Sequence, residues 1–323
     1  MGSGESRGRA PATIANIGPG FDVFGMAIRG LGDEVLLRAA RSDSLEVEGP
    51  EGQGLPASFE RNTAGIVLQA LRRASGVRDP LEVLVRKGVP PGRGLGSSAA
   101  SGAAAAVAFV RAYPETARLG AAVFLRAAVE GEAAVAGRHY DNVAAALLGG
   151  FVSIGSAQPL VLVREPVSPR IHLAVAVPAT EMRTAEMRKV LPRQVRLQDA
   201  VSNVGKAATL ALALVRGDAV VAGRCLEDRI AEPRRAPFLR GFEDVRAAAL
   251  EAGATGCAMA GSGSTVFAIA PRRALAEQSA KAMRDAFGRH ETIAKAFTTH
   301  VDNSVPLRPA LPKAGPRFSL VTP

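Results

Sequence analysis

Short apolar segments predict the strands of the chain. Residues 81–86, 160–164 and 171–177 carry the period of two that places alternate side chains on opposite faces of a sheet. Residues 257–260 and 265–270 are apolar runs on either side of a glycine-rich turn. All of these segments are expected to be strands.

Longer segments in which apolar residues recur every three or four positions predict the helices. The best-marked helix begins after Asn62, a candidate N-cap, and is closed by Gly76. Further helices are predicted over residues 98–111, 117–136, 198–215, 218–230, 242–252 and 272–287. Residues 1–9 are rich in Gly and Ser, and residues 305–323 contain five prolines, so both stretches are expected to be irregular.

The length of 323 residues predicts one large or two medium domains, because single hydrophobic cores stop growing at roughly 250–300 residues. Residues 150–170 hold strand candidates interrupted by Gly and Pro, and they are the best place for a domain junction. Hydrophobic residues make up 47% of the chain and charged residues 22%, which excludes wholesale disorder.

Charge and cysteine content narrow the class of protein. The net charge is +10, but the arginines are scattered and aromatic residues are scarce, which argues against a nucleic-acid surface. The longest apolar stretch, residues 102–110, is far shorter than the ~20 residues of a membrane span. Cys225 and Cys257 lie in apolar segments and are expected to be buried thiols in a reducing compartment. These features predict a cytoplasmic protein.

The segment most specific for a function is PPGRGLGSSAASGAAAA at residues 90–106. Gly92, Gly94 and Gly96 allow positive φ and a close approach of the backbone to a ligand. The helix that follows Ser97 points its positive end at the same place, so the segment predicts a phosphate-binding loop. It is neither a Walker loop, which needs a Lys, nor a dinucleotide-binding fingerprint, whose spacing differs.

Two further glycine-rich segments are weaker when taken alone. Asn16 and Asp22 flank the turn Gly18-Pro19-Gly20, a pattern that turn chemistry by itself explains. Residues 261–264, Gly-Ser-Gly-Ser, lie between two apolar runs and predict a hairpin or a second backbone approach to a ligand.

In this order, the three segments resemble the signature of the GHMP kinase superfamily of small-molecule kinases. Residues 90–100 carry its phosphate-loop pattern PxxxGLGSSA. Residues 15–22, 139–151 and 226–245 resemble segments of the homoserine kinases within it, and the similarity extends over about residues 10–302.

The sequence departs from the family pattern at two places. The third motif usually reads SGSGPT, whereas here Ala260 and Ser264 replace its first Ser and its Pro, which puts a phosphate contact there in doubt. Ser6-Arg7-Gly8-Arg9 stands where a strand normally leads into the first motif, which puts the length of that strand in doubt.

The resemblance implies a two-domain α+β fold with the site between the domains. A ribosomal-protein-like βαβ domain that binds ATP is expected over residues 1–160, a ferredoxin-like domain over 161–304, and a Pro-rich tail over 305–323. The implied reaction is ATP-dependent phosphorylation of the side-chain hydroxyl of L-homoserine to O-phospho-L-homoserine, a step of threonine biosynthesis. The implied partners are these small molecules, with neither nucleic acid nor membrane. A homodimer is an open alternative to a monomer.

The resemblance also implies where the nucleotide and its Mg²⁺ bind. Asn62 and Lys87 are expected near the nucleotide, although a plain N-cap is an equal interpretation of Asn62. Ser98 and Glu130 match the family's magnesium ligands, and Glu132 is a competitor two positions away. The ATP phosphates are expected on Pro90, Pro91, Gly92, Arg93, Gly94, Leu95, Gly96, Ser97, Ser98, Ala99 and Ala100.

Homoserine is a zwitterion, so its carboxylate calls for guanidinium groups and its ammonium for carboxylate or amide oxygens. Arg188 and Arg235 match the carboxylate-binding positions of the family, with Thr184 beside them; Arg183 and Arg234 are adjacent alternatives. The amino end and the hydroxyl are expected to be held by Asn16, Asp22 and His139.

The implied phosphoryl transfer asks the protein mainly for positioning and charge stabilisation. Asp141 is the candidate general base, with Asn142 and Asn16 as candidates for orienting the hydroxyl; the alternative is a reaction without a base. Two alternative functions are also consistent with parts of the sequence. One is a GHMP-type kinase for shikimate or mevalonate, and the other is a basic nucleic-acid-binding protein. The second does not need the GLGSS loop.

Overall fold

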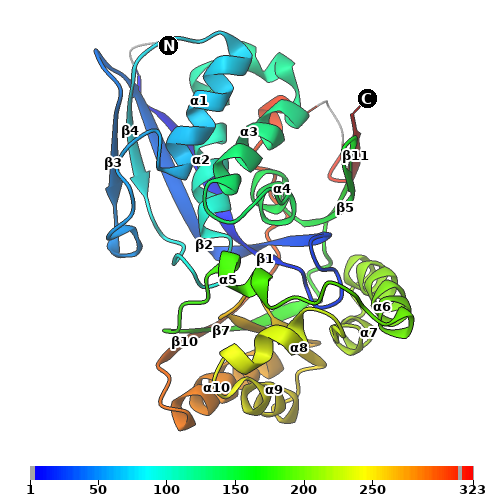
Figure 1. The fold of residues 1–323 in the computed structure, drawn as a ribbon. Coiled ribbons are helices and arrows are strands. Elements are labelled where there is room, and N and C mark those ends of the chain that lie inside the picture. Colours follow the sequence, from blue (N-terminus) through cyan, green and yellow to red (C-terminus); the bar gives the residue numbers. More distant parts are fainter. Residues whose placement is uncertain (1–3, 312–314, 323) are drawn as a thin grey trace.

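The computed structural model describes residues 4–311 and 315–322, which form two layered units (Figure 1). The first unit contains a seven-stranded mixed sheet with helices α1–α4 on one face. The second contains a four-stranded sheet with helices α9 and α10 packed on it. The α+β, two-unit architecture that the sequence predicts is therefore confirmed.

In the first unit, the strands follow the order β11-β6-β5-β2-β4-β3, with β1 paired to β2. Their bounds are β1 Ser6–Ala15, β2 Phe24–Ala39, β3 Ser44–Glu48, β4 Leu81–Arg86, β5 Phe151–Ala157, β6 Leu160–Glu165 and β11 Phe318–Val321. Strands β3 and β4 run parallel and are joined through α1, which gives the expected βαβ unit.

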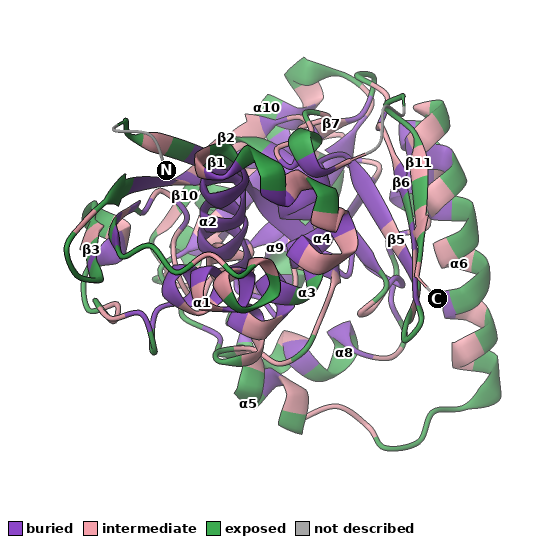
Figure 2. Cartoon of the chain, turned by 90° about the horizontal axis from the view of Figure 1, so that it is seen from above, coloured by how far each residue is buried: buried purple, intermediate pink, exposed green. Residues whose placement is uncertain are grey.

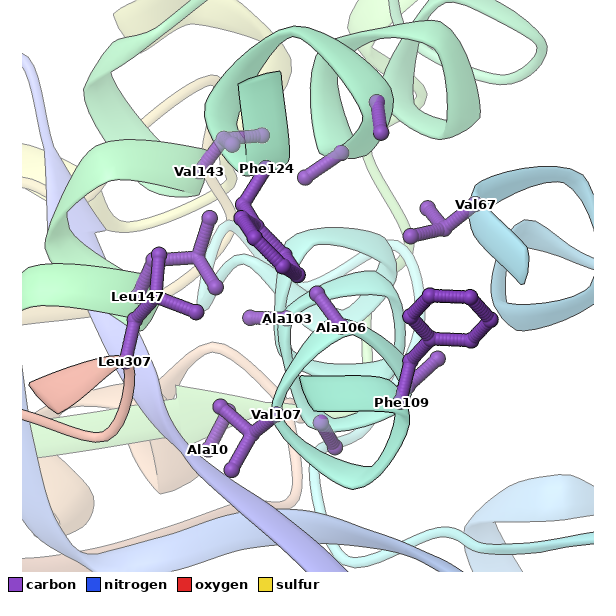
Figure 3. Packing of buried hydrophobic residues seen from close by; sticks show 14 of the residues in the cluster. Ala10, Val67, Ala103, Ala106, Val107, Phe109, Phe124, Val143, Leu147 and Leu307 are labelled. Atoms are coloured by element: carbon purple, nitrogen blue, oxygen red, sulfur yellow. The ribbon is translucent and has the colours of Figure 1, made fainter. Parts of the chain in front are cut away.

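An alanine-rich helix forms the centre of the first unit. Its helices are α1 Thr63–Ser75, α2 Ser97–Ala112, α3 Ala121–Ala133 and α4 Asp141–Leu148, with 3₁₀ turns η1 Pro50–Gly52, η2 Pro114–Leu119 and η4 Arg308–Ala310. Because the side chains of α2 are small, the neighbouring elements come close, and a Cβ on Gly8 of β1 would lie 2.0 Å from the carbonyl oxygen of Ala104. Figure 3 shows the larger side chains, among them Phe109, Phe124 and Leu147, gathered around this helix.

The second unit has the strand order β10-β7-β9-β8, and all its pairs are antiparallel. The strands are β7 His172–Pro178, β8 Gly256–Met259, β9 Val266–Ala270 and β10 Ala294–Thr299. The helices are α5 Thr184–Lys189, α6 Leu197–Arg216, α7 Ala219–Arg224, α8 Glu232–Arg235, α9 Phe242–Glu251 and α10 Arg273–Arg289, with the 3₁₀ turn η3 Ala236–Phe238. This order is that of a ferredoxin-like sheet, as expected.

The junction and the tail differ from expectation. Strand β6 pairs with β5 and with β11, so the first unit extends through Glu165 instead of ending at residue 160. The expectation that residues 305–323 are irregular is wrong, because Leu307 and Ala310 belong to the core of the first unit and Phe318–Val321 forms a strand. Arg164 explains this attachment: its buried guanidinium donates to the carbonyl oxygens of Asn303 and Pro316.

Three element predictions also need correction. Ser6–Arg9 is not loose: it begins β1 and pairs with β2, so the first strand has its full length. The helix predicted over 218–230 ends at Arg224, because the Asp228 carboxylate accepts hydrogen bonds from the amides that begin α8. The helix predicted over 117–136 is shorter and follows the 3₁₀ turn η2.

The two units share one apolar core, which fixes them together. Ile14 of β1 is fully buried in the same cluster as Leu173 of β7 and Phe267 of β9. Seen from above, buried residues occupy the centre and exposed residues the outer helices (Figure 2). Cys257 is buried and Cys225 is half-buried, and both are free thiols. In the described parts of the chain, no helix is both long and apolar enough to cross a membrane.

Candidate active site

A cleft of about 450 Å³ lies where the two units meet, a volume within the usual range of small-molecule sites. The first unit contributes the phosphate loop, the turn after β1, and the ends of α3 and α4. The second contributes α5, α8 and the glycine-rich turn between β8 and β9. The predicted site residues that line it are Asn16, Asp22, Asn62, Lys87, Pro91, Gly92, Gly94, Gly96, Ser97, Ser98, His139, Asp141, Asn142, Thr184, Arg188 and Arg235.

The phosphate loop forms part of the wall of this cleft. Gly92, Gly94 and Gly96 have φ angles of 66°, 77° and 64°, in the left-handed region that favours glycine. A Cβ on Gly96 would lie 2.0 Å from Thr13 Oγ1 and 2.8 Å from Asn142 Oδ1. The loop therefore brings its backbone against neighbouring elements just where α2 begins, the arrangement that suits an anion.

Not every residue of the loop reaches the cleft. Leu95, Ala99 and Ala100 are buried beneath it, while Pro90 and Arg93 are outside its lining. One Nη of Arg93 is buried without a hydrogen-bond partner among the described atoms. These five residues support the loop and are not positioned to contact a ligand in the cleft.

The side chain of Lys87 holds the base of the phosphate loop in place. Its ammonium pairs with the buried carboxylate of Asp33 and donates to Ser97 Oγ and Ser101 Oγ, both at 2.9 Å. Burial lowers the pKa of Lys87, and Asp33 acts in the opposite direction. Since Asp33 also accepts from the amide of Val89, this network ties β2, β4 and the start of α2 together. Lys87 borders the cleft, but its donors hold the loop in place.

The two acidic residues near the end of α3 have different surroundings. Glu130 makes an ion pair with Arg73 at 2.6 Å, is 43% exposed and does not line the cleft, so its assignment as a metal ligand is wrong. Glu132 is buried, lines the cleft and accepts a hydrogen bond from Ser98 Oγ. Residues two positions apart on a helix face different sides, which explains the difference.

Ser98 and Glu132 suit a hard cation. Burial raises the pKa of Glu132, and no basic side chain pairs with it among the described residues. A buried carboxylate without a counterion gains from a bound cation, and Mg²⁺ typically takes one or two protein oxygens and completes its shell with phosphate and water. The described residues contain no cluster of three or more His, Cys, Asp or Glu that would form a complete metal site by themselves.

The turn after β1 forms another part of the wall of the cleft. Asn16 and Asp22 have φ angles of 67° and 58°, a conformation that Asn and Asp tolerate better than most residues. The Asn16 amide donates to the carbonyl oxygen of Gly261 at 2.8 Å and accepts from the backbone amide of Asp22 at 3.0 Å. The first and third motifs are therefore joined through Asn16.

Two arginines face this turn. Arg188 donates to both carboxylate oxygens of Asp22, at 2.6 and 3.1 Å, and its buried Nε finds no acceptor among the described residues. Arg235 donates to the carbonyl oxygen of Gly261 at 3.0 Å, and burial lowers its pKa. The Phe21 ring lies 5.5 Å from one guanidinium and 5.2 Å from the other, within cation–π distance.

His139 completes this cluster. Its Nδ1 lies 3.2 Å from Arg188 Nη2 and 3.7 Å from Asp22 Oδ1. Burial lowers the pKa of His139, which favours the neutral imidazole near neutral pH. Thr184 lies at the start of α5, with its hydroxyl 3.1 Å from that of Ser262 in the third motif.

Asp141 also lines the cleft. Burial raises the pKa of this carboxyl group to about 7, although the amide of Asn142 donates to it at 2.7 Å. Asn142 is fixed in turn, since its Oδ1 accepts a hydrogen bond of 2.7 Å from the hydroxyl of Thr13. A buried carboxyl group with a pKa near 7 is able to accept a proton at neutral pH.

Some residues of the site were not singled out from the sequence. Phe21 is an aromatic residue inside a turn of small and polar residues, which was its only signal. Thr13 lies in an apolar strand and carries no signal. Asn62 is confirmed as the N-cap of α1, since its side chain accepts from the amide of Ala64 at 3.0 Å, and it also borders the cleft.

The fold and the phosphate loop agree with the similarity to known families. Residues 62–150 match the GHMP kinases N terminal domain, and residues 210–289 match the GHMP kinases C terminal domain. Together they define the class of the protein as a two-domain small-molecule kinase.

The chain is also similar to particular members of that class. It is 42% identical to a homoserine kinase of Pyrococcus abyssi over 86% of this chain and 91% of that protein. It is 43% identical to a homoserine kinase of Thermococcus gammatolerans over 86% and 92%. The crystal structure of homoserine kinase from Cytophaga hutchinsonii is 34% identical, covers 94% of this chain and 96% of its own, and superposes with a TM-score of 0.86. The chain belongs to the homoserine kinase family of GHMP kinases.

Proposed function

We propose that this protein transfers the γ-phosphoryl group of ATP to the side-chain hydroxyl of L-homoserine. The observation that carries the proposal is the cluster of Arg188, Arg235 and Asp22 in the same cleft as the phosphate loop. An amino acid carries one carboxylate and one ammonium group. The cluster carries the complementary charges, two guanidinium groups and one carboxylate. The activity named for the relatives supports the same substrate.

The phosphate loop binds the phosphates of ATP in this proposal. Gly92, Gly94, Gly96, Ser97 and Ser98 line the cleft where α2 begins, so their backbone and the positive end of α2 are proposed to bind the phosphates together. Asp33 and Lys87 keep the loop in this conformation from below.

Ser98 and Glu132 would hold Mg²⁺ with the phosphate oxygens. When bound, the cation supplies neutralisation of the charge on the transferred group. The buried, uncompensated carboxylate of Glu132 is the feature that fits this role.

The acceptor cluster binds homoserine by its two charged groups. The unpartnered Nε of Arg188 and the guanidinium of Arg235 are the donors proposed for the carboxylate. The Asp22 carboxylate and the Asn16 side chain are proposed to face the ammonium group. Thr184 and the neutral ring of His139 border the same space.

Asp141 is proposed to accept the proton in the transfer step. The hydroxyl oxygen of homoserine forms a bond to the γ-phosphorus, its proton passes to the Asp141 carboxylate, and the bond to the bridging oxygen breaks to release ADP. Asn142, held by Thr13, borders the reacting atoms and orients the hydroxyl.

Steady-state kinetics on a substrate panel test the proposal. Homoserine should be phosphorylated with ATP and Mg²⁺, whereas shikimate and mevalonate, which lack the ammonium group, should not. Arg188→Ala and Arg235→Ala should each lower kcat/KM for homoserine by on the order of a hundredfold, because a charge-assisted hydrogen bond in a desolvated site is worth a few kcal/mol. Arg188→Lys should rescue poorly, since an ammonium does not reproduce the planar fork.

Two controls make this result specific. Arg234→Ala removes a neighbouring arginine that is exposed and does not line the cleft, and it should leave turnover nearly unchanged. The weak activity on 3-aminopropanol, which lacks the carboxylate, should fall little in either variant. Full homoserine turnover in both Arg188→Ala and Arg235→Ala would refute the proposed acceptor site.

A further inference from the structure

The segment that leads into α5 joins the second unit to the phosphate loop. The backbone amide of Met182 donates to the carbonyl oxygen of Gly92 at 3.0 Å. Two residues earlier, the carbonyl oxygen of Thr180 accepts a hydrogen bond from the hydroxyl of Ser264, which follows the third motif's glycines. Figure 1 shows α5 at the level where the two units meet. The backbone of this segment is therefore held in place beside the start of the phosphate loop.

Two charged side chains of this segment, Glu181 and Arg183, line the cleft. The Glu181 carboxylate lies against the phosphate loop, because a Cβ on Gly92 would be 2.9 Å from Glu181 Oε1 and 2.5 Å from its Cγ. The Nε of Arg183 lies 3.3 Å from the same carboxylate oxygen. The Arg183 guanidinium is therefore held near the start of the loop through Glu181.

The backbone of Arg183 is fixed, but its side chain is not. The side chain of Arg183 is 70% exposed and that of Glu181 is 53% exposed. An exposed ion pair of this kind is weak, because water and salt screen it. A polyphosphate carries more negative charge than one carboxylate, and arginine binds phosphate well through its planar fork. Phosphate groups on the loop therefore compete successfully with Glu181 for the guanidinium.

The transfer of a phosphoryl group calls for positive charge beside it. One Mg²⁺ neutralises only part of the charge of a triphosphate, and a basic side chain near the transferred group stabilises the transition state further. Lys87 supports the loop from below, and Arg188 and Arg235 belong to the acceptor cluster. Among the basic residues that line the described cleft, this leaves Arg61 and Arg183. Of these two, Arg183 belongs to the segment that is bonded to the loop.

In sequence, Arg183 lies between a residue bonded to the phosphate loop and residues that border the acceptor. Met182 precedes it and donates to the loop. Thr184 follows it, with its hydroxyl 3.1 Å from that of Ser262, and the same short helix carries Arg188 of the acceptor cluster. The transferred group passes from a nucleotide on the loop to the acceptor, so a guanidinium attached at this position is close to its path.

We propose that Arg183 is a catalytic residue, which leaves Glu181 when ATP binds and donates to the γ-phosphate. Glu181 has the opposite effect, because its carboxylate lies against the loop and repels the phosphates until Arg183 turns toward them. Arg183 keeps its protons and forms no covalent bond, so the transfer step itself is the one described above. The inference rests on the proposed function in that ATP is the nucleotide, but it holds for any acceptor.

Titration calorimetry with ATP and with ADP, each with Mg²⁺ and without an acceptor, tests the contact to the γ-phosphate. Arg183→Ala should weaken ATP binding about tenfold, the effect of one lost hydrogen bond between charged groups, and should change ADP binding less than about twofold. Arg183→Lys should recover part of the loss, because it keeps the charge without the fork. Lys189→Ala is the matched control: Lys189 is exposed on the same helix and does not line the cleft, so both affinities should be retained.

Glu181→Gln tests the role of the carboxylate. ATP affinity should rise by about threefold or more, because the loop loses a repelling charge and Arg183 loses its partner. Glu186→Gln is the matched control, since Glu186 is exposed on α5 outside the cleft lining, and it should change nothing. A merely structural ion pair predicts that Arg183→Ala and Glu181→Gln act in the same direction, whereas this proposal predicts opposite directions.

Steady-state kinetics complete the test. With homoserine as acceptor, Arg183→Ala should lower kcat by about tenfold or more and leave the KM for homoserine nearly unchanged, which distinguishes its role from that of the acceptor cluster. Three results would each overturn the inference: equal losses of ATP and ADP affinity in Arg183→Ala, weaker ATP binding in Glu181→Gln, or a loss specific to ATP in Arg61→Ala instead. A wild type that shows the ATP-specific effect of Arg183 but phosphorylates no homoserine would refute the proposed function and leave this inference intact.

Discussion

At the scale of single residues, the surroundings of each acidic side chain decide what that side chain is able to do. Glu130 and Glu132 are two positions apart, yet the first is neutralised by Arg73 at the surface and the second is buried beside Ser98. Both carboxylates can be read in the sequence, but the side of the helix that faces the cleft cannot. For that reason the sequence does not show that Glu132, and not Glu130, lines the cleft.

The pair Glu130 and Glu132 provides a matched test of the metal site. Glu132→Gln keeps the size and removes the charge, so kcat should fall by about a hundredfold and more Mg²⁺ should be needed for half-maximal activity. Glu130→Gln removes only a surface ion pair and should change activity little. Steady-state assays across Mg²⁺ concentrations measure both. Equal behaviour of the two variants would contradict the assignment of Glu132.

Asp141 should impose a pH dependence on the reaction. Its pKa is raised to about 7, chiefly by burial, so the carboxylate form that accepts a proton is present above pH 7 and is lost as the pH falls through this value. For the wild type, kcat/KM should rise with pH and level off above about 7. Asp141→Asn should remove this limb and lower kcat by about 10²–10⁴-fold. If the limb persists in the variant, another group is titrating and the reaction does not need this base.

At the scale of elements, the sequence predicted those whose apolar spacing is regular. Strand β4 was predicted at its observed bounds, and α6, α9 and α10 were each predicted within two residues at either end. Strand β2 was not predicted, because its residues 24–28 are all buried and its register with β1 shifts between Ile28 and Gly32, so buried and exposed side chains do not alternate along it. Helix α7 was predicted too long, because the side chain of Asp228, and not the apolar pattern, determines where α8 begins.

The parts of the candidate site that are continuous in sequence could be predicted. The phosphate loop and the Asn16–Asp22 turn are continuous in sequence, and both line the cleft. Contacts between distant segments were not predictable from composition or spacing. Thr13 bonds Asn142 across 129 residues, and Lys87 pairs with Asp33 across 54 residues.

The loop that begins α2 should be intolerant of any side chain at Gly96. A Cβ there would lie 2.0 Å from Thr13 Oγ1, and the φ angle of 64° is itself unfavourable for alanine. Gly96→Ala should weaken ATP binding at least tenfold, as measured by titration calorimetry. Gly30→Ala distinguishes the strain of positive φ from the steric clash of the added Cβ. Gly30 also has positive φ, but its Cβ would meet nothing within 4 Å, so ATP affinity should be retained. Normal affinity in a folded Gly96→Ala protein would argue against this loop as the phosphate site.

At the scale of the whole molecule, Arg164 holds together parts of the chain that are far apart in sequence. Its guanidinium is buried and donates to the carbonyl oxygens of Leu148, Gly149, Asn303 and Pro316. Burial lowers its pKa, while Glu165 and Asp302 act in the opposite direction. One side chain thus joins α4, β6 and the segment that leads to β11.

Arg164→Met should therefore lower the free energy of unfolding by about 3 kcal/mol or more, since it leaves several buried carbonyl groups without donors. Denaturant unfolding followed by circular dichroism measures the loss. Arg317→Met is the control, because Arg317 is 66% exposed and pairs with Glu165 at the surface, and it should cost about 0.5 kcal/mol or less. A comparable loss in the two variants would mean that the buried network contributes little.

The position of β11 has a consequence for the order in which the molecule is completed during synthesis. Strand β11 belongs to the first sheet, yet its residues, Phe318–Val321, emerge from the ribosome after the entire second unit. Domains generally fold as units from the N-terminal side while the chain is being made. Here the edge of β6 in the first unit lacks its partner β11 while the second unit is being translated. The nascent chain is therefore most exposed to edge-to-edge association in that interval.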